Sequence, residues 1–370
     1  MYLQSLFLQQ FRNYKEVYFE FNPSLNLICG PNAQGKTSLL EAIHYLMIGR
    51  SFRPCLHQDL IQFGSSSFYL ETIFCKHGVD QKLRVHVDSK ERKMIYNSTV
   101  LPNVSNLLGL IQGVVMTPDD VNLVKGPPLL RRQFLDIQIA QVDPLYVHYL
   151  ARYAKAMRHR NQLLKQKKLM SIESWEHEMA QATAYIIMKR RHGIQALQTH
   201  CQTFYTYLTE ETEHLSLEYR SGASVCQNEE EIKDFHTQQF QKNRSREMIL
   251  GHTMCGPHKD DIWIGIGGRD VRYFASEGQQ RSCVAALHMG EWQRLNQVAE
   301  DTPLFMIDDV GISLDDKRRE RLLNQLAALG QVFLTTTDSR LMDSFTSSKK
   351  IFLLPLATHA CLSPTYPHTS

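Results

Sequence analysis

The chain has 370 residues, enough for two or three domains that each bury a core. Its 43% hydrophobic and 21% charged residues are ordinary for a soluble protein, and a net charge of +3 does not by itself indicate a nucleic-acid partner. The eight cysteines include no Cys-x-x-Cys pair, which argues against a zinc or disulfide framework. The first residues lack the pattern of a signal peptide, and no apolar run reaches the roughly 18 residues of a membrane span. We therefore expect a cytoplasmic protein with no membrane partner.

A phosphate-binding loop lies near the N-terminus, after an apolar run at 25–29 and before a helical pattern. It fits the motif Gly-x-x-x-x-Gly-Lys-Ser/Thr, in which backbone N–H groups at a helix N-terminus hold phosphate oxygens. The lysine of this motif reaches the β- and γ-phosphates, and the next hydroxyl binds Mg²⁺. The sequence therefore predicts ATP and Mg²⁺ as cofactors, held by Gly30, Pro31, Asn32, Ala33, Gln34, Gly35, Lys36 and Thr37.

Segments on both sides of this loop alternate apolar and polar residues, namely 19–25, 68–87 and 94–100. The alternation predicts strands that form a β-rich flank of the core. Arg50 and Arg53 follow the helix that the loop begins. They are typical of a cationic helix end, but could also face ATP or DNA.

The middle of the chain, residues 129–247, is rich in helix formers and has little strand pattern. Residues 152–168 carry seven basic side chains and no acid, and Lys189-Arg190-Arg191 form a second basic group. Such segments could follow a phosphate backbone. Equally, they could be a solvated face balanced by Glu173, Glu176 and Glu178. The residues alone leave both readings open.

A Ser-x-Gly-Gln segment precedes an apolar helical pattern late in the chain. Ser276 is a suitable helix N-cap, so one reading is a capped helix and nothing more. The segment also resembles the signature loop of ABC-type ATPases, which contacts the γ-phosphate of ATP on the opposite subunit. That reading makes Ser276, Gly278 and Gln279 nucleotide-binding residues. His258, which follows a Gly-Pro turn, is interpreted as a loop residue and not as a catalytic base.

The apolar run 303–307 ends in Asp308-Asp309, the form of a buried parallel strand that ends in carboxylates. Beside a phosphate loop, the first acid is expected on the metal side and the second as the base that activates water. We therefore predict that Thr37 and Asp308 hold the metal and that Asp309 is catalytic. Ser313-Leu314-Asp315 resembles the D-loop of ABC ATPases, which adds Asp315 to the nucleotide site. A second strand is predicted at 332–338, and it ends in Thr337 and Asp338, where ABC ATPases usually place a histidine.

Taken in order, these motifs resemble the RecF family of bacterial recombination-mediator ATPases, which is related to the structural-maintenance-of-chromosomes group. The resemblance runs from residue 2 to about 340. It implies a DNA-dependent ATPase that dimerises on ATP, binds single-stranded and gapped duplex DNA, and helps partner proteins to load a recombinase. Roles in replication and the SOS response are implied with it. The motifs that carry the resemblance are residues 11–14, 30–37, 49–53, 117–120, 125–127, 131–136, 256–261, 279–281 and Asp308-Asp309-Val310.

The expected fold class is α/β, an ABC-type P-loop ATPase head with a β-rich flank and an inserted helical lobe. Residues 1–128 and 248–370 would form the head, because Gly30 and Asp308 must share one site, and residues 129–247 would form the lobe. One alternative is a transporter's ATP-hydrolysing subunit, although such subunits keep the phosphate and signature loops much closer. Another is a chromosome-organising ATPase, which would need long coiled-coil arms that the heptad pattern does not predict.

Overall fold

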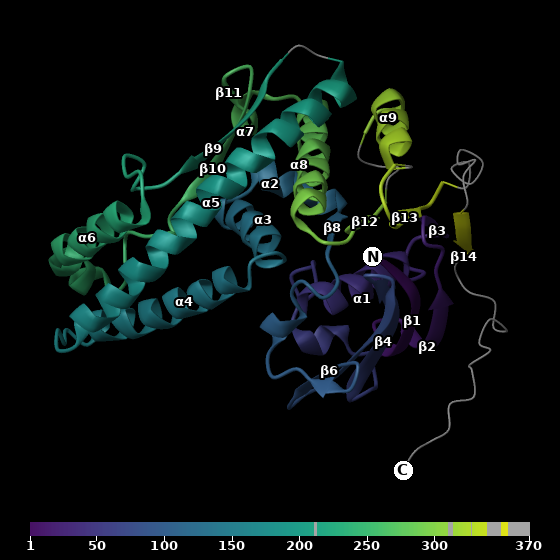
Figure 1. Ribbon diagram of the computed structural model, residues 1–370, viewed down its shortest axis with the longest axis horizontal. Coiled ribbons are helices and arrows are strands. Elements are labelled where there is room, and N and C mark those ends of the chain that lie inside the picture. Colours follow the sequence, from purple (N-terminus) through teal and green to yellow (C-terminus); the bar gives the residue numbers. More distant parts are fainter. Residues whose placement is uncertain (211–212, 310–313, 327, 339–348, 354–370) are drawn as a thin grey trace. The chain divides into compact units, whose positions relative to one another are not determined.

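The computed structural model describes residues 1–210, 213–309, 314–326, 328–338 and 349–353 (Figure 1). They fall into two compact units. Unit 1 consists of Met1–Asp119 and Trp292–Ser370, and unit 2 is Asp120–Glu291. Unit 2 thus includes residues 248–291, which lie outside the expected lobe boundaries. That residues 248–291 act as part of the ATPase head stays a prediction.

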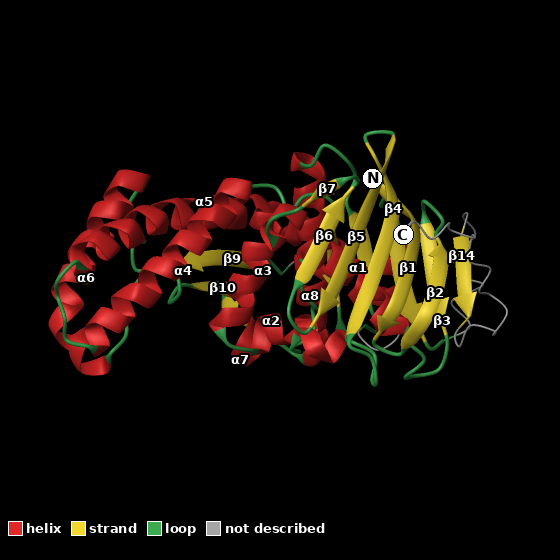
Figure 2. Ribbon diagram, turned by 90° about the horizontal axis from the view of Figure 1, so that it is seen from below, coloured by secondary structure: helices red, strands yellow, loops and turns green. Residues whose placement is uncertain are grey.

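Unit 1 contains a six-stranded antiparallel sheet, seen in Figure 2, in the order β2-β1-β4-β5-β6-β7. This sheet is the β-rich flank expected from the sequence. Its strands alternate buried and partly exposed side chains, as in β4, because one face lies on the core. The strands are β1 (Tyr2–Phe11), β2 (Tyr14–Glu20), β4 (Ser67–Lys76), β5 (Val79–Asp88), β6 (Arg92–Tyr96) and β7 (Thr99–Val100).

A five-stranded parallel sheet forms the second layer of unit 1, in the order β14-β3-β13-β12-β8. Its central strands are buried along their whole length, as expected for parallel strands covered on both faces. The strands are β3 (Leu25–Cys29), β8 (Gly113–Met116), β12 (Leu304–Ile307), β13 (Val332–Thr336) and β14 (Lys349–Leu353). Because β13 lies between β3 and β12, it separates the phosphate-loop strand from the acidic strand.

The helix α1 (Lys36–Ile48) is buried on nearly every side and contacts both β1 and β13. The two sheets also meet directly, since Phe21 packs edge-on against Phe333 and Gln331 exchanges hydrogen bonds with the backbone of Leu3. Unit 1 also contains the helix α9 (Asp316–Leu326). Its short 3-10 helices are η1 (His57–Leu60), η2 (Val104–Leu107) and η3 (Pro118–Asp120), and η3 ends at the unit boundary.

Unit 2 is mainly helical, and α4, α5 and α6 pack against one another. Its helices are α2 (Val121–Lys125), α3 (Pro128–Ala140), α4 (Pro144–Lys165), α5 (Ile172–Thr209), α6 (Glu229–Leu250), α7 (Val271–Phe274) and α8 (Glu277–Val298), which continues into unit 1. A small sheet has the order β11-β10-β9. Its strands are β9 (Leu215–Arg220), β10 (Asp261–Ile266) and β11 (Arg269–Asp270).

The structure corrects one local expectation, and it shows where the small sheet gives way to a helix. The expected helical region contains β9, whose buried Leu215 and Leu217 alternate with more exposed residues and which pairs with distant β10. The antiparallel pair of β10 and β11 ends at Asp270. The Asp270 side chain then accepts a hydrogen bond from the N–H of Arg272 and caps α7, so Val271–Phe274 is helical.

Candidate nucleotide-binding site

The phosphate loop connects β3 to α1, as the sequence predicts, and its shape depends on glycine. Gly35 has a φ of 102°, in the left-handed region. A Cβ at this position would lie 2.8 Å from the hydroxyl of Tyr14, which donates a hydrogen bond to the Gly35 carbonyl at 3.1 Å. Any other residue here would clash with the β1–β2 turn and strain the backbone. The glycine of the motif is therefore required by packing as well as by backbone conformation.

Lys36 is buried beneath this loop. Its ammonium donates hydrogen bonds to the carbonyls of Gly30 at 2.7 Å and Pro31 at 2.9 Å. Among the described residues no carboxylate forms an ion pair with it. A buried cation that is solvated only by carbonyl dipoles favours an incoming anion. The residues therefore fit a polyphosphate at this loop.

Thr37 and Asp308, the two predicted metal ligands, are brought together although 271 positions separate them. The Thr37 hydroxyl donates to Asp308 Oδ1 at 3.0 Å, and Asp308 is buried at the end of β12. A hydroxyl beside a carboxylate is an oxygen donor set that suits Mg²⁺. The chemistry of the pair thus fits the predicted cation.

Thr335, which the sequence analysis did not assign, completes this cluster from β13. Its fully buried hydroxyl donates to Asp308 Oδ1 at 2.8 Å and accepts the N–H of Asp309, also at 2.8 Å. Thr335 thus orients the metal-side acid and anchors the backbone of the predicted base. The only signal in the sequence was a run of threonines at the end of a strand, where ABC ATPases usually place a histidine.

Asp309 is held in an uncommon backbone conformation. Its φ of 53° lies in the left-handed region, which a non-glycine residue seldom occupies. Such conformations cost about 1–3 kcal/mol and persist where the surrounding structure enforces them. Asp309 also lines the pocket that contains the phosphate loop. This position is compatible with the predicted catalytic role, which stays a prediction.

The pocket has a volume of about 1140 Å³ and receives residues from the β-rich flank as well as from the loop. Arg53 and the fully exposed ring of Phe63 belong to it. The Arg53 guanidinium forms no ion pair among the described residues, which favours the reading of Arg53 as a residue that faces the nucleotide. The further lining residues include Asn32, Ala33, Gly35, Lys36, Thr37 and Asp308 from the predicted set.

Arg12 also lines the pocket, but its charge is already neutralised. It donates two hydrogen bonds to the fully buried Glu41, at 2.6 and 2.7 Å, and a third to the carbonyl of Asp59. The bond to Glu41 raises the pKa of Arg12. Ser51 donates to the same carboxylate. The Phe-Arg-Asn-Tyr motif therefore fastens the β1–β2 turn to α1 and sets the wall of the pocket.

The Ser-x-Gly-Gln segment lies in unit 2, at the start of α8. Ser276 and Gln279 form a capping box, because the Ser276 hydroxyl accepts the Gln279 N–H at 3.2 Å and the Gln279 side chain accepts the Ser276 N–H at 2.9 Å. The capped helix is thus confirmed. Ser276 and Gly278 are exposed, and the Gln279 amide donates to Glu213. Their contact with a nucleotide on a second subunit stays a prediction.

The remaining predicted residues take simple structural roles. Asp315 is exposed and caps α9 by accepting the N–H of Arg318 at 2.9 Å. Ser313 and Val310 lie outside the described residues. Asp338 follows β13, and its N–H donates to the Thr336 hydroxyl. Whether Thr337 or Asp338 takes the place of the usual histidine stays open to experiment.

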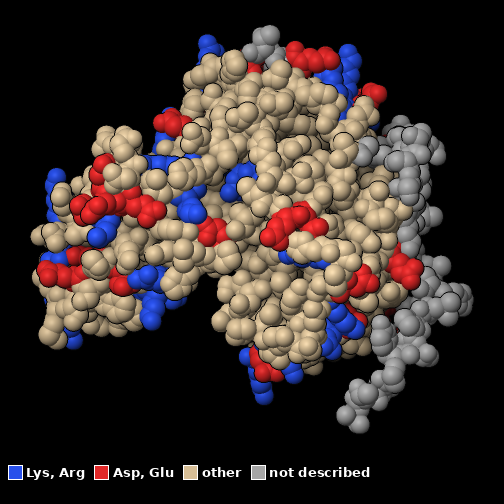
Figure 3. All heavy atoms as spheres, viewed as in Figure 1, with Lys and Arg blue, Asp and Glu red and all other residues tan. Residues whose placement is uncertain are grey.

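The second basic group is structural. Lys189 pairs with Asp143 at 2.7 Å, and buried Arg190 pairs with Asp136 at 2.8 Å. Arg191 donates to backbone carbonyls, among them that of Cys226. These side chains stabilise unit 2 and are not available to a phosphate backbone. On the face seen in Figure 3, Lys and Arg are interspersed with Asp and Glu.

The longer basic segment, 152–168, contains some side chains that are balanced by acids and others that could bind phosphate. Arg152 pairs with Glu178, and fully buried Arg160 pairs with Glu176, so these two follow the structural reading. Exposed basic residues remain on α4 and the turn after it, without ion pairs among the described residues. They are Lys155, Arg158, Lys165, Lys167 and Lys168.

His258 lies in a turn, as expected, and is unsuited to act as a base for the nucleotide. Its Nε2 donates to the Thr253 carbonyl at 3.2 Å, since a carbonyl can only accept. Its Nδ1 therefore accepts from the hydroxyl of buried Tyr153 at 2.6 Å. Burial lowers the pKa of His258 to about 4. The ring is a neutral link between α4 and the turn.

Comparison with known proteins places these features in a family. A family model described as the RecF/RecN/SMC N-terminal domain matches residues 2–356. The chain is 60% identical to the DNA replication and repair protein RecF of Protochlamydia amoebophila (strain UWE25) over 96% of this chain and 99% of that protein. It is 35% identical to the protein of the same name from Chlamydia caviae, over 95% and 96% of the two chains.

Solved structures agree with the sequence relatives. A structure described as the recombination mediator protein RecF with ATP in the RecFOR pathway has a TM-score of 0.86 and 30% identity, over 91% of this chain and 92% of that one. An Smc head bound to the winged-helix domain of ScpA has a TM-score of 0.55 and 14% identity, over 92% and 91%, and shares the fold alone. The predicted ABC-type ATPase head fold is confirmed. Among the described residues, none of the helices combines the length and apolar character needed to cross a bilayer.

Proposed function

We propose that this chain, which belongs to the RecF family within the RecF/RecN/SMC group, is a DNA-binding ATPase of recombinational and post-replication DNA repair. ATP binding is supported by a related structure that contains ATP. The observation that carries the proposal is the cluster of Thr37, Asp308 and Thr335 beside the buried ammonium of Lys36. The ends of three strands far apart in the sequence, β3, β13 and β12, converge there on one site.

Different residues of the site would bind the phosphates, the base and the metal. Lys36 and the backbone of residues 30–37 hold the phosphates, and Arg53 adds a second positive charge. The exposed ring of Phe63 offers a flat face on which a base can stack. Thr37 and Asp308 would hold Mg²⁺, which neutralises phosphate charge when it is bound.

Hydrolysis depends on the strained acid. Asp309 takes a proton from the attacking water, while Thr335 keeps its backbone in place. We infer a weak, DNA-dependent activity in which ATP acts mainly as a switch. Exposed Ser276 and Gly278, with Gln279 and Asp315, would then complete the site of a second copy, so that ATP joins two chains.

The dimer would bind single-stranded and gapped duplex DNA in the cytoplasm and help mediator proteins to load a recombinase, in support of replication and the SOS response. Chromosome organisation by long coiled-coil arms is not favoured. The 38-residue α5, the longest described helix, packs within unit 2 against α4 and α6. A transporter subunit is not favoured by any of the relatives reported above.

Binding to gapped duplex DNA tests the proposal. Fluorescence anisotropy with ATP, ADP or no nucleotide should show tight binding only with ATP, and the affinity should fall as salt increases. Lys36→Ala should bind with ATP no better than the wild type does with ADP. Equal affinity in all three nucleotide states would contradict an ATP switch.

A further inference from the structure

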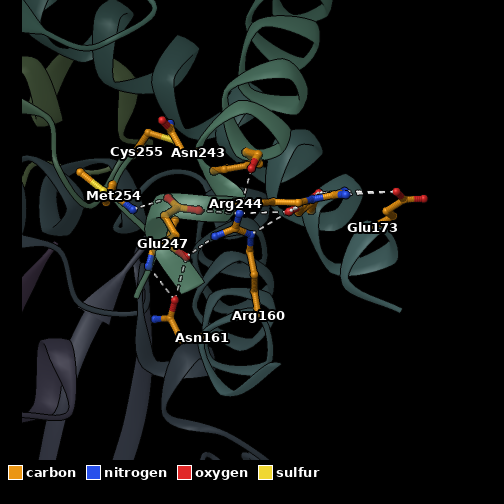
Figure 4. Close-up of polar contacts among 11 residues, drawn as sticks. Arg160, Asn161, Glu173, Asn243, Arg244, Glu247, Met254 and Cys255 are labelled. Carbon is orange, nitrogen blue, oxygen red and sulfur yellow. Dashed lines mark hydrogen bonds and ion pairs between the residues drawn. The ribbon is translucent and has the colours of Figure 1, made fainter. Parts of the chain in front are cut away.

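A buried network of ions joins the ends of α4, α5 and α6 (Figure 4). Fully buried Arg160 of α4 contacts Glu176 of α5 at 3.0 Å and Glu247 of α6 at 2.7 Å. Arg244 of α6 contacts Glu176 and the exposed carboxylate of Glu173. Buried charges are stable only when they are paired in good geometry, so the network requires one arrangement of the three helices.

The same network holds the chain that follows α6. The Glu247 side chain accepts the N–H of Met254 at 2.6 Å, and Arg160 donates to the Thr253 hydroxyl at 2.9 Å. Gly251 ends α6 and lies against the side chain of Lys165, at the end of α4. The end of α4 and the end of α6 are therefore held together in one rigid frame.

This frame displays large apolar side chains to solvent. Met170 and Ile249 are each 85% exposed. Leu169 and Leu250, their neighbours in sequence, are about half exposed. We call Leu169, Met170, Ile249 and Leu250 the helix-end patch. Scattered exposed apolar residues need no explanation, but these are two pairs of sequence neighbours, each close to one of two helix ends that buried ions hold together, which makes them a candidate interaction surface.

Cations lie in the same two segments as the patch, and among the described residues no ion pair balances their charge. Exposed basic side chains lie in the same two segments and form no ion pair among the described residues; they are Lys165, Lys167, Lys168 and Arg246. The nearby acids Glu173, Glu176 and Glu247 are already engaged with Arg160 and Arg244. Exposed apolar side chains and unbalanced positive charges therefore occur together in the two segments at these helix ends.

We propose that the helix-end patch binds an acidic segment of a partner protein that carries apolar anchor side chains. Carboxylates of the segment would pair with the unbalanced lysines, and its apolar side chains would cover Met170 and Ile249. A nucleic acid fits this surface less well. It would use the lysines but leave the aliphatic centre exposed, and the patch contains no aromatic ring on which a base could stack.

The probe is a fluorescent synthetic peptide in which Asp and Glu alternate with Leu and Phe, added to the full chain. A second peptide has Ser in place of Leu and Phe, and labelled oligo-dT tests nucleic acid. Met170→Asp and Ile249→Asp should each weaken binding of the first peptide by about tenfold or more. Val225→Asp is the matched control, because Val225 is 77% exposed in the same unit but outside the patch.

Charge and anchor are tested separately. Lys167→Ala combined with Lys168→Ala should weaken binding of the first peptide and make that binding less dependent on salt. The Ser-containing peptide should bind more weakly than the first. The proposal is overturned if the wild type does not bind the first peptide, or if Val225→Asp weakens it as much as Met170→Asp does. The proposal is also overturned if the patch variants weaken binding of oligo-dT more than they weaken binding of the first peptide. Circular dichroism of each variant establishes that the fold is intact.

Discussion

Replacing Thr335 by valine should uncouple the two acids of the nucleotide site. Valine keeps the shape of the buried side chain but removes the hydroxyl that binds both Asp308 and the N–H of Asp309. A hydrogen bond to a charged group contributes about 1.5–3 kcal/mol, and Asp308 retains its bond from Thr37. We therefore expect unit 1 to lose about 2–3 kcal/mol of stability, through the Asp308 bond and the unpaired N–H together.

Catalysis should fall more than nucleotide binding. Without the hydroxyl, the left-handed backbone of Asp309 is no longer anchored, so kcat should drop by about tenfold, or about 1.4 kcal/mol of transition-state stabilisation. KM should change by less than about threefold, because the phosphate loop and Lys36 are untouched. Steady-state ATP hydrolysis and urea unfolding measure the two effects.

Two matched variants distinguish the effect of losing the Thr335 hydroxyl from general damage to β13. Thr335→Ser keeps the hydroxyl and should retain most activity. Thr336→Val removes the neighbouring buried hydroxyl, which binds Asp338 and not the acids of the site. Wild-type kcat in Thr335→Val, or an equal loss in Thr336→Val, would refute the role assigned to Thr335.

Further predictions concern the other residues of the site and the ring of His258. Lys36→Ala should abolish ATP binding in equilibrium dialysis, because the buried ammonium is lost; wild-type affinity would exclude the phosphate site. Asp308→Asn should weaken Mg²⁺-dependent ATP binding, whereas Asp309→Asn should bind ATP but hydrolyse it at least about a hundredfold more slowly; normal turnover in Asp309→Asn would place the base elsewhere. Ser276→Arg should bind ATP as a monomer yet form no ATP-induced dimer in sedimentation, and equal dimer fractions with ATP and ADP would leave Ser276 only a helix cap. Burial lowers the pKa of His258 to about 4, so the unfolded chain binds this proton first as pH falls below about 6.5, and stability should fall by about 3 kcal/mol by pH 4. His258→Asn should flatten this pH dependence in urea unfolding, and an unchanged slope would refute the role of His258.

The sequence alone determined the features that depend on consecutive residues. Gly35, Lys36 and Thr37 are consecutive residues of one phosphate-loop motif at the start of α1, and Ser276 and Gln279 are three residues apart in one capping box. Asp308 and Asp309 follow an apolar run that predicted a buried strand, and β12 confirms the strand. Local geometry sufficed for these, because the interacting groups are neighbours along the chain.

Only the tertiary structure decided which distant residues join them. Thr335 reaches Asp308 because β13 pairs with both β3 and β12, a strand order that no local pattern specifies. Arg190 looked like part of a basic surface, but it is buried against Asp136, 54 residues away. Long side chains of the same composition can face water or a carboxylate, and the choice depends on which helices pack together. The charge of a segment was thus readable from the sequence, whereas its availability to a partner was settled by the fold.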